Sequence, residues 1–186
     1  MNNFQEIADR VEIEALRGEF TDAAMMRDRP RLAALFTADA VLRMPNVPVE
    51  FIGREQILAG GERLQSQWDF FVQNSHPGVI RIDGDTATGR TYMQELARLR
   101  DGRSGQNFAI YHDTYRRTAE GWRFAERVYE VRYADTTPLN GSAPGTEAQA
   151  RAEAGTEAQT RAEDFGAPAS AERLGRTIAA PRADGV

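Results

Sequence analysis

The sequence predicts an α+β fold, in which a curved antiparallel sheet wraps onto about three helices near the N-terminus. Two observations carry this prediction: helical periodicity comes first along the chain, and extended runs separated by turn residues follow it. A curved sheet folded onto helices leaves space between the two layers. We therefore expect an internal apolar pocket.

The helices are predicted before residue 69. A long first helix is indicated by apolar residues that recur at steps of three and four, namely Ile13, Leu16, Phe20, Ala23 and Ala24. Asp28 and Pro30 provide an N-cap and a first-turn proline for a short second helix that stops near Thr37. Helical spacing then resumes after Gly53, over residues 54–68.

The strands are predicted as a pair followed by a meander. The runs at 40–45 and 49–53 pair around turn residues, and four further runs lie at 78–83, 84–100, 105–118 and 120–134. In the last run, one face carries Ala125, Arg127, Tyr129, Val131 and Tyr133. Arg127 on a buried face requires an anionic ligand or a structural ion pair with Asp113 or another carboxylate, and both alternatives stay open.

The composition changes near Ala134, which predicts a folded domain over residues 1–134 and a largely flexible tail over 135–186. The tail is rich in Ala, Glu and Gly. It contains a tandem repeat, GTEAQARAEA at 145–154 and GTEAQTRAED at 155–164. A short docking helix near the end of the tail is the alternative.

Composition also bears on the class of partner. The net charge of −5 gives no positive field for nucleic acid, and the absence of cysteine leaves no disulfide, thiolate nucleophile or Cys-ligated metal. No apolar run has the length of a signal peptide core or a membrane span, so we expect a cytoplasmic protein without a membrane partner. The scattered histidines and carboxylates predict no metal site.

Three segments together resemble a known family: RVEIEALRGEFTDAAMMRDRPRLAALFTADAVLRMP, SHPGVIRIDGDTATGRTYMQE and YHDTYRRTAEGWRFAERV. In order and spacing they are similar to the SnoaL-like branch of the nuclear-transport-factor-2-like superfamily, over about residues 5–134. The resemblance implies a cone-shaped α+β barrel, usually a homodimer. Its relatives include cofactor-independent polyketide cyclases, steroid isomerases and dehydratases, and also binding or structural subunits.

The resemblance also suggests site residues. His76 and Arg127 match the catalytic histidine and arginine of dehydratase-like relatives, although His76 could equally be a loop residue that caps a strand. Phe20 and Met25 stand where those relatives carry a tyrosine and an aspartate, so the histidine lacks its usual acidic partner. Phe20 and Met25 are then expected to bind substrate.

Tyrosines could supply phenol donors to an oxyanion, since Tyr residues act in this way in related pockets. We expect Tyr111 and Asp113 to join the catalytic group, and Tyr92 and Tyr129 to contact substrate. The alternative for each tyrosine is core packing with a satisfied hydroxyl. His112 is expected to lie outside the pocket, on the opposite strand face.

These residues predict a cofactor-independent enzyme that isomerises, dehydrates or cyclises a polyketide-, steroid- or terpenoid-like molecule by acid–base chemistry. The alternative is a non-catalytic small-molecule-binding or assembly protein of the same fold. Geometry separates the two: an enzyme requires His76, Arg127 and a tyrosine hydroxyl to converge on one cavity, whereas side chains that pair with each other in a filled core argue against it.

Overall fold

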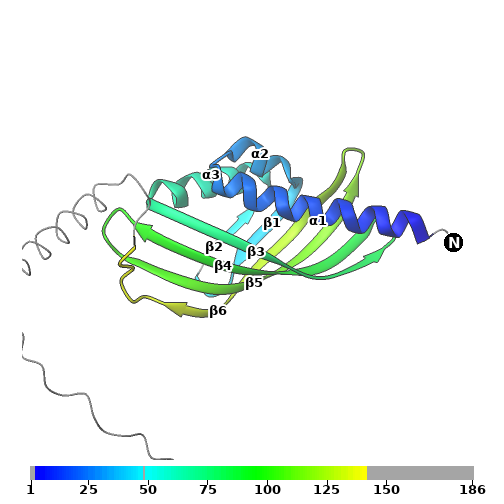
Figure 1. The fold of residues 1–186 in the computed structure, drawn as a ribbon. Coiled ribbons are helices and arrows are strands. Elements are labelled where there is room, and N and C mark those ends of the chain that lie inside the picture. Colours follow the sequence, from blue (N-terminus) through cyan, green and yellow to red (C-terminus); the bar gives the residue numbers. More distant parts are fainter. Residues whose placement is uncertain (1–2, 48, 142–186) are drawn as a thin grey trace, which may run out of the picture. The chain divides into compact units, whose positions relative to one another are not determined.

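The computed structural model describes residues 3–47 and 49–141, and shows three helices on one side of a curved six-stranded sheet (Figure 1). The predicted α+β fold is confirmed. The helices are α1 (Asn3–Met25), α2 (Arg29–Ala34) and α3 (Arg54–Ser66). The strands are β1 (Phe36–Met44), β2 (Val49–Ile52), β3 (Trp68–Asp83), β4 (Thr86–Leu99), β5 (Ser104–Thr118) and β6 (Gly121–Asp135).

The sheet has the order β2-β1-β6-β5-β4-β3 and is open at both edges. Its pairings are antiparallel except for β1 with β6, which run parallel. The β3–β6 meander therefore joins the β1–β2 hairpin through the last strand. The predicted tail starts at residue 135, but Asp135 still belongs to β6, and residues 136–141 are described without a helix or strand. Residues 142–186, which contain the tandem repeat, lie outside the described residues, and the predicted boundary at 134 stays a prediction.

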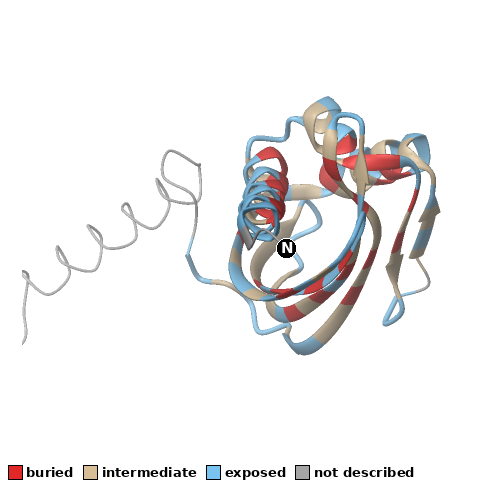
Figure 2. Ribbon diagram, turned by 90° about the vertical axis from the view of Figure 1, so that its right-hand side faces the viewer, coloured by how far each residue is buried: buried red, intermediate tan, exposed pale blue. Residues whose placement is uncertain are grey.

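Helix α1 covers the sheet with the face that its periodicity predicts. Ile13, Leu16, Phe20, Ala23 and Ala24 are all buried, and buried positions gather where helices face the sheet (Figure 2). The phenyl ring of Phe20 packs edge-on against the rings of Phe36, Tyr111 and Phe124. Burial of this apolar face holds the helix on the sheet, since each fully buried large side chain contributes about 1.5–3 kcal/mol.

A carboxylate clamp ties the first turns of α1 to the sheet. Asp9 accepts hydrogen bonds from both terminal nitrogens of Arg117 on β5, at 2.6 Å each, and from the indole N–H of Trp122 on β6, at 3.2 Å. The hydrogen bonds from Arg117 lower the pKa of Asp9 to about 2. The ionised carboxylate is thus part of the folded state.

Helices α2 and α3 begin as the sequence predicts. The side chain of Asp28 accepts a hydrogen bond from the backbone N–H of Arg31, and Pro30 lies in the first turn of α2. Gly53, with a φ of 84°, precedes α3 in a conformation that favours glycine. Further along α3, Gly60 lies against the ring of Phe51 on β2, which allows the helix and strand to approach closely.

Two sequence-based expectations about the sheet require correction. β3 begins at Trp68 rather than near Gly78, so the ten residues expected to precede the strand belong to it. Register shifts on β6 opposite Phe108–Ala109 and Thr114–Tyr115 break the strict alternation. Tyr133 is consequently half exposed on the outer face, although Arg127 and Tyr129 keep the predicted inward direction.

The two adjacent glycines of α3 provide a matched test of this packing. In Gly60→Ala the new methyl would lie 2.3 Å from the Phe51 ring, so we expect urea unfolding to show a loss of about 1–3 kcal/mol. A Cβ on Gly61 meets nothing within 4 Å, so Gly61→Ala should gain about 0.5–1 kcal/mol from helix propensity. Equal effects of the two substitutions would contradict the Phe51 contact.

The clamp predicts a specific acid dependence. A lowered pKa stabilises the fold above the unfolded-state pKa of Asp9, and this stabilisation is lost as the pH falls from about 4 toward 2. Asp9→Asn should remove the part of the pH dependence of stability that comes from Asp9, and should lower the free energy of unfolding by about 1–2 kcal/mol at pH 7. Unfolding curves between pH 2 and 7 measure both, with Asp85→Asn, an exposed partner of Arg117, as the control that changes little.

Candidate active site

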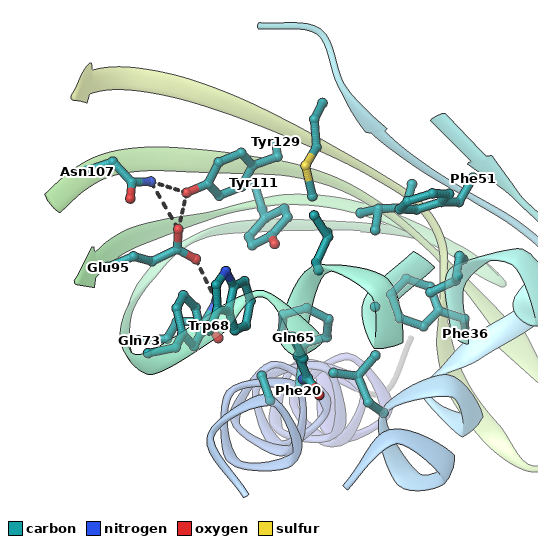
Figure 3. Close-up of a pocket in the computed structure, with 18 residues that line it drawn as sticks. Phe20, Phe36, Phe51, Gln65, Trp68, Gln73, Glu95, Asn107, Tyr111 and Tyr129 are labelled. Carbon is teal, nitrogen blue, oxygen red and sulfur yellow. Dashed lines mark hydrogen bonds between the residues drawn. The ribbon is translucent and has the colours of Figure 1, made fainter. Parts of the chain in front are cut away.

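A cavity of about 260 Å³ lies between the helices and the inner face of the sheet (Figure 3). Most of its wall is apolar, and aromatic rings from five strands and α1 form much of it. The rings belong to Phe20, Phe36, Phe51, Trp68, Phe71, Tyr111 and Tyr129. The predicted internal apolar pocket is therefore present.

One end of this cavity is polar. Glu95 on β4 stands directly between Gln73 on β3 and Asn107 on β5 in the strand register. The amide N–H groups of these neighbours donate to Glu95, from Gln73 to Oε1 at 3.2 Å and from Asn107 to Oε2 at 3.0 Å. The hydroxyl of Tyr129 on β6 also donates to Oε2, and Figure 3 shows the four side chains together.

The Glu95 carboxyl is the ionisable acid of the cavity. Burial raises its pKa above the ordinary value, while hydrogen bonds from Tyr129, Asn107 and Gln73 and the charge of Arg127 act in the opposite direction. A carboxylate offers about four lone-pair sites, and these three donors leave roughly one, on Oε1, for a ligand. A carboxylate of raised pKa with a free lone pair can act as a general base.

Two tyrosine hydroxyls accompany this carboxylate as proton donors. Burial raises the pKa of both Tyr111 and Tyr129, so both phenols stay protonated near neutral pH. Tyr129 is engaged with Glu95 and Asn107. The hydroxyl of Tyr111 forms no hydrogen bond within the described chain and points into the cavity (Figure 3). Tyr111 is thus free to donate to a bound molecule.

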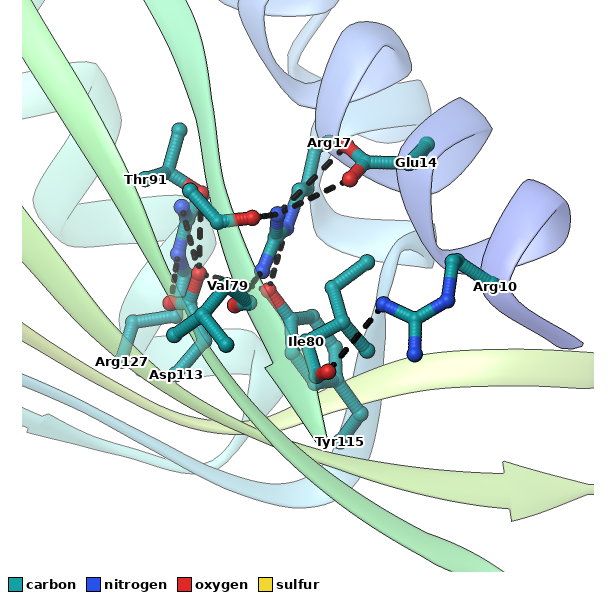
Figure 4. Close-up of polar contacts among 10 residues, drawn as sticks. Arg10, Glu14, Arg17, Val79, Ile80, Thr91, Asp113, Tyr115 and Arg127 are labelled. Atoms are coloured by element: carbon teal, nitrogen blue, oxygen red, sulfur yellow. Dashed lines mark hydrogen bonds and ion pairs between the residues drawn. The ribbon is translucent and has the colours of Figure 1, made fainter. Parts of the chain in front are cut away.

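Arg127 is buried outside the cavity and paired with Asp113, its cross-strand partner (Figure 4). The guanidinium donates to the carboxylate at 2.7 Å and 3.3 Å. Its central carbon lies 3.8 Å from the ring centre of Tyr111 and 4.1 Å from that of Phe20. These rings separate the cation from the cavity, and the structural ion pair considered from the sequence is the arrangement observed.

The ion pair extends into a buried network that reaches α1. The Tyr115 hydroxyl donates to Asp113 at 2.8 Å and accepts from Nε of Arg17 at 2.8 Å (Figure 4). The Arg17 guanidinium also donates to the backbone carbonyl of Val79 on β3. Asp113 therefore binds Arg127 and Tyr115 inside the filled core and does not line the cavity, which corrects its expected position in the pocket.

His76 lies outside the cavity, on the outer face of β3. Ser75 turns inward, where its hydroxyl accepts a hydrogen bond from Thr21 of α1, so the pleat directs His76 outward. Its cross-strand partner Tyr92 is also exposed, at 42%. The expected positions of His76 and Tyr92 in the pocket are corrected for this reason, and the convergence required for a His76-based mechanism is not met.

The remaining predicted residues divide between the cavity and its surroundings. Phe20, Tyr111 and Tyr129 line the cavity. Met25 does not line the cavity. Its sulfur accepts a hydrogen bond from the backbone N–H of Gln73 at 3.1 Å, which joins the end of α1 to β3. His112 pairs with Glu130 at 2.7 Å and is 44% exposed, in agreement with its predicted place outside the pocket.

Glu95, Gln73 and Asn107 were missed by sequence analysis. A usable signal existed for Glu95, because alternation in TYMQEL places it on the same face as Thr91 and Met93, both buried. Gln73 has no such signal, since the sequence predicts no strand over its segment. Within residues 3–47 and 49–141, no group of three potential ligands could hold a metal ion and no helix is long and apolar enough to cross a membrane.

A curved sheet that covers an apolar cavity with a polar end defines a pocket protein of the cone-shaped α+β class. The chain belongs to the SnoaL-like domain family, which it matches over residues 5–128. The resemblance predicted from the sequence is confirmed. No curated protein sequence matches the chain.

Solved structures share the fold at low identity. A type 2 hexachlorocyclohexane dehydrochlorinase (LinA) is 22% identical with a TM-score of 0.70, over 78% of this chain and 100% of its own. The dehydrochlorinase LinA-type3 from Novosphingobium barchaimii is 22% identical with a TM-score of 0.68, over 76% of this chain and 97% of its own. A proposed scytalone dehydratase from Novosphingobium aromaticivorans is 18% identical with a TM-score of 0.67, over 77% of this chain and 97% of its own.

The core network can be tested by a double substitution. Asp113→Leu leaves Arg127 buried without its partner, so we expect a loss of about 3–5 kcal/mol in urea unfolding. Asp113→Leu combined with Arg127→Met removes both charges and should be less destabilised than Asp113→Leu alone. A double variant that is less stable than the single one would contradict the ion-pair assignment.

Proposed function

We propose that the protein is a cofactor-independent lyase, isomerase or cyclase that moves a proton on a small hydrophobic molecule, with Glu95 as the general base. One observation carries the proposal: a partly buried carboxyl group, whose pKa is raised by desolvation, stands at the polar end of an otherwise apolar cavity. Membership of the SnoaL-like family supports it. Polyketide-, steroid- and terpenoid-like molecules are the candidate substrates of this proposal.

The residues suggest how the proton would move. Oε1 of Glu95 would take a proton from a carbon next to a carbonyl group, and the electron pair of the broken C–H bond would move toward the carbonyl oxygen. Tyr111 would donate a hydrogen bond to that developing oxyanion. Return of the proton to another atom of the same molecule gives isomerisation, and departure of a leaving group gives elimination. Cyclisation results when the enolate carbon bonds to a second carbonyl carbon of the same molecule, whose oxygen takes up the C=O electron pair and then the proton from Glu95.

The neighbours of Glu95 would position the base. Gln73, Asn107 and Tyr129 hold its carboxylate in one orientation through three donors. Arg127 lies behind Tyr111 and favours the anionic form of Glu95 through its charge. In this proposal Arg127 and Asp113 are positioning residues, and His76 takes no part in the proton transfer. The expected homodimer and cytoplasmic location stay predictions.

Exchange of 2-tetralone protons tests the proposal without a known substrate. The protein should accelerate deuterium uptake next to the carbonyl in D₂O, and Glu95→Gln should lower that rate by about 10²–10⁴-fold, since it removes the base and keeps the shape. The rate should fall as the pH drops through the raised pKa of Glu95, because the base must be ionised. Nuclear magnetic resonance measures the exchange.

Two controls sharpen this experiment. Glu130→Gln changes a carboxylate outside the cavity and should leave the exchange rate unchanged, and His76→Ala should do the same. Equal rates for the wild type and Glu95→Gln would reject the base and favour the non-catalytic binding protein. A rate that depends on His76 instead would restore the histidine-based mechanism.

A further inference from the structure

We infer that Gly61 on α3 determines the size of the ligand, because its missing side chain leaves room in the cavity for a second ring. This inference deepens the proposed function and rests on it in one respect, namely that the cavity is the substrate site. It follows from the face of α3 on which Gly61 lies, from the lack of a backbone or packing reason for glycine there, and from the volume of the cavity.

Gly61 lies on the face of α3 that forms part of the cavity wall. The residues of this helix that line the cavity are Ile57, Gly61, Leu64 and Gln65. Residues three and four positions apart lie on the same side of an α-helix, and at about 100° per residue Gly61 falls between Leu64 and Gln65 around the axis. The next residue, Glu62, is exposed. A Cβ on Gly61 would therefore point toward the cavity.

Neither the backbone nor the packing requires glycine at this position. Gly61 has no positive φ, and a Cβ built on it meets no atom within 4 Å. The preceding glycine differs, since a Cβ on Gly60 would lie 2.3 Å from the ring of Phe51. Glycine inside a helix lowers stability relative to alanine. Gly61 thus lowers stability while it leaves the cavity open, a combination expected where function and stability conflict.

The volume of the cavity shows how large a ligand this open space admits. An apolar protein cavity of about 150 Å³ accommodates benzene, which is roughly 25 Å³ for each non-hydrogen atom. The 260 Å³ of this cavity corresponds to about ten such atoms, the size of a two-ring molecule. A leucine side chain in place of Gly61 would take about 100 Å³ on this scale and leave about 160 Å³, enough for one ring.

The wall around Gly61 suits the hydrocarbon part of such a molecule. Two of the three other lining residues of α3 are aliphatic. The third is Gln65, whose side-chain oxygen already accepts a hydrogen bond from Arg29 at 3.0 Å. Glu95 and its hydrogen-bond donors lie on the strands of the sheet. The ligand would therefore direct its carbonyl group toward the sheet and an apolar ring toward α3.

Two ketones that differ by one ring test the inference: cyclohexanone, with one ring, and 2-tetralone, with two. Gly61→Leu should weaken the binding of 2-tetralone by about tenfold or more, because the leucine occupies the space of one ring. The binding of cyclohexanone should change by less than about threefold, because space for one ring remains. Titrations followed by nuclear magnetic resonance measure both dissociation constants. Unchanged binding of 2-tetralone to Gly61→Leu, equal loss of both ketones, or no binding of either to the wild type would overturn the inference.

Gly18→Leu is the matched control. A Cβ on Gly18 of α1 also meets nothing within 4 Å, but Gly18 is exposed and does not line the cavity. Both leucines should raise the midpoint of urea unfolding, since leucine favours a helix more than glycine does. Only Gly61→Leu should change the ratio of the two dissociation constants. If Gly61→Leu fails to fold, Gly61→Ala should shift the ratio in the same direction by a smaller factor, and an unchanged ratio would reject the inference.

Binding is measured without turnover, so this inference and the proposed function can fail separately. A size preference that depends on Gly61, without exchange of 2-tetralone protons, would reject only the proposed catalysis. Proton exchange that depends on Glu95, together with equal binding of 2-tetralone by Gly61→Leu and the wild type, would reject only the role of Gly61.

Discussion

The carboxylate of Asp113 is the centre on which the rest of the structure depends. It accepts from Arg127 on β6 and Tyr115 on β5, and Tyr115 in turn accepts from Arg17 on α1. Because an unpaired charge in the core is costly, the helix and the strands must meet in the arrangement that completes this network. The same arrangement places the ring of Tyr111 over the cation and thereby forms one wall of the cavity.

The buried carboxylate of Asp113 and the partly buried carboxylate of Glu95 differ in their neighbours, and so in what they can do. Asp113 faces Arg127 in a filled core, so its charge is neutralised by a structural ion pair. Glu95 faces neutral amide and phenol donors beside open space, so its charge is held in place but not neutralised. Different environments for two acids are the usual means by which proteins divide structural and chemical roles between them.

Much of the fold was predictable because local chemistry decides it. The buried face of α1, the Asp28 cap and the glycine before α3 follow from periodicity and backbone geometry, and all are confirmed. The start of β3 was not predictable in this way, because residues 68–77 mix aromatic and polar side chains without clear alternation. Only pairing with β4 makes that segment a strand.

The sequence by itself determined the fold class, the family and the apolar character of the interior, since these depend on the order and period of residue types. The tertiary structure decided which polar groups reach the cavity. One residue along a strand reverses the direction of a side chain, so the pleat of β3 turns His76 outward and Gln73 inward. Glu95 meets Asn107 and Tyr129 only because strands distant in sequence lie side by side, and no local pattern reports that proximity.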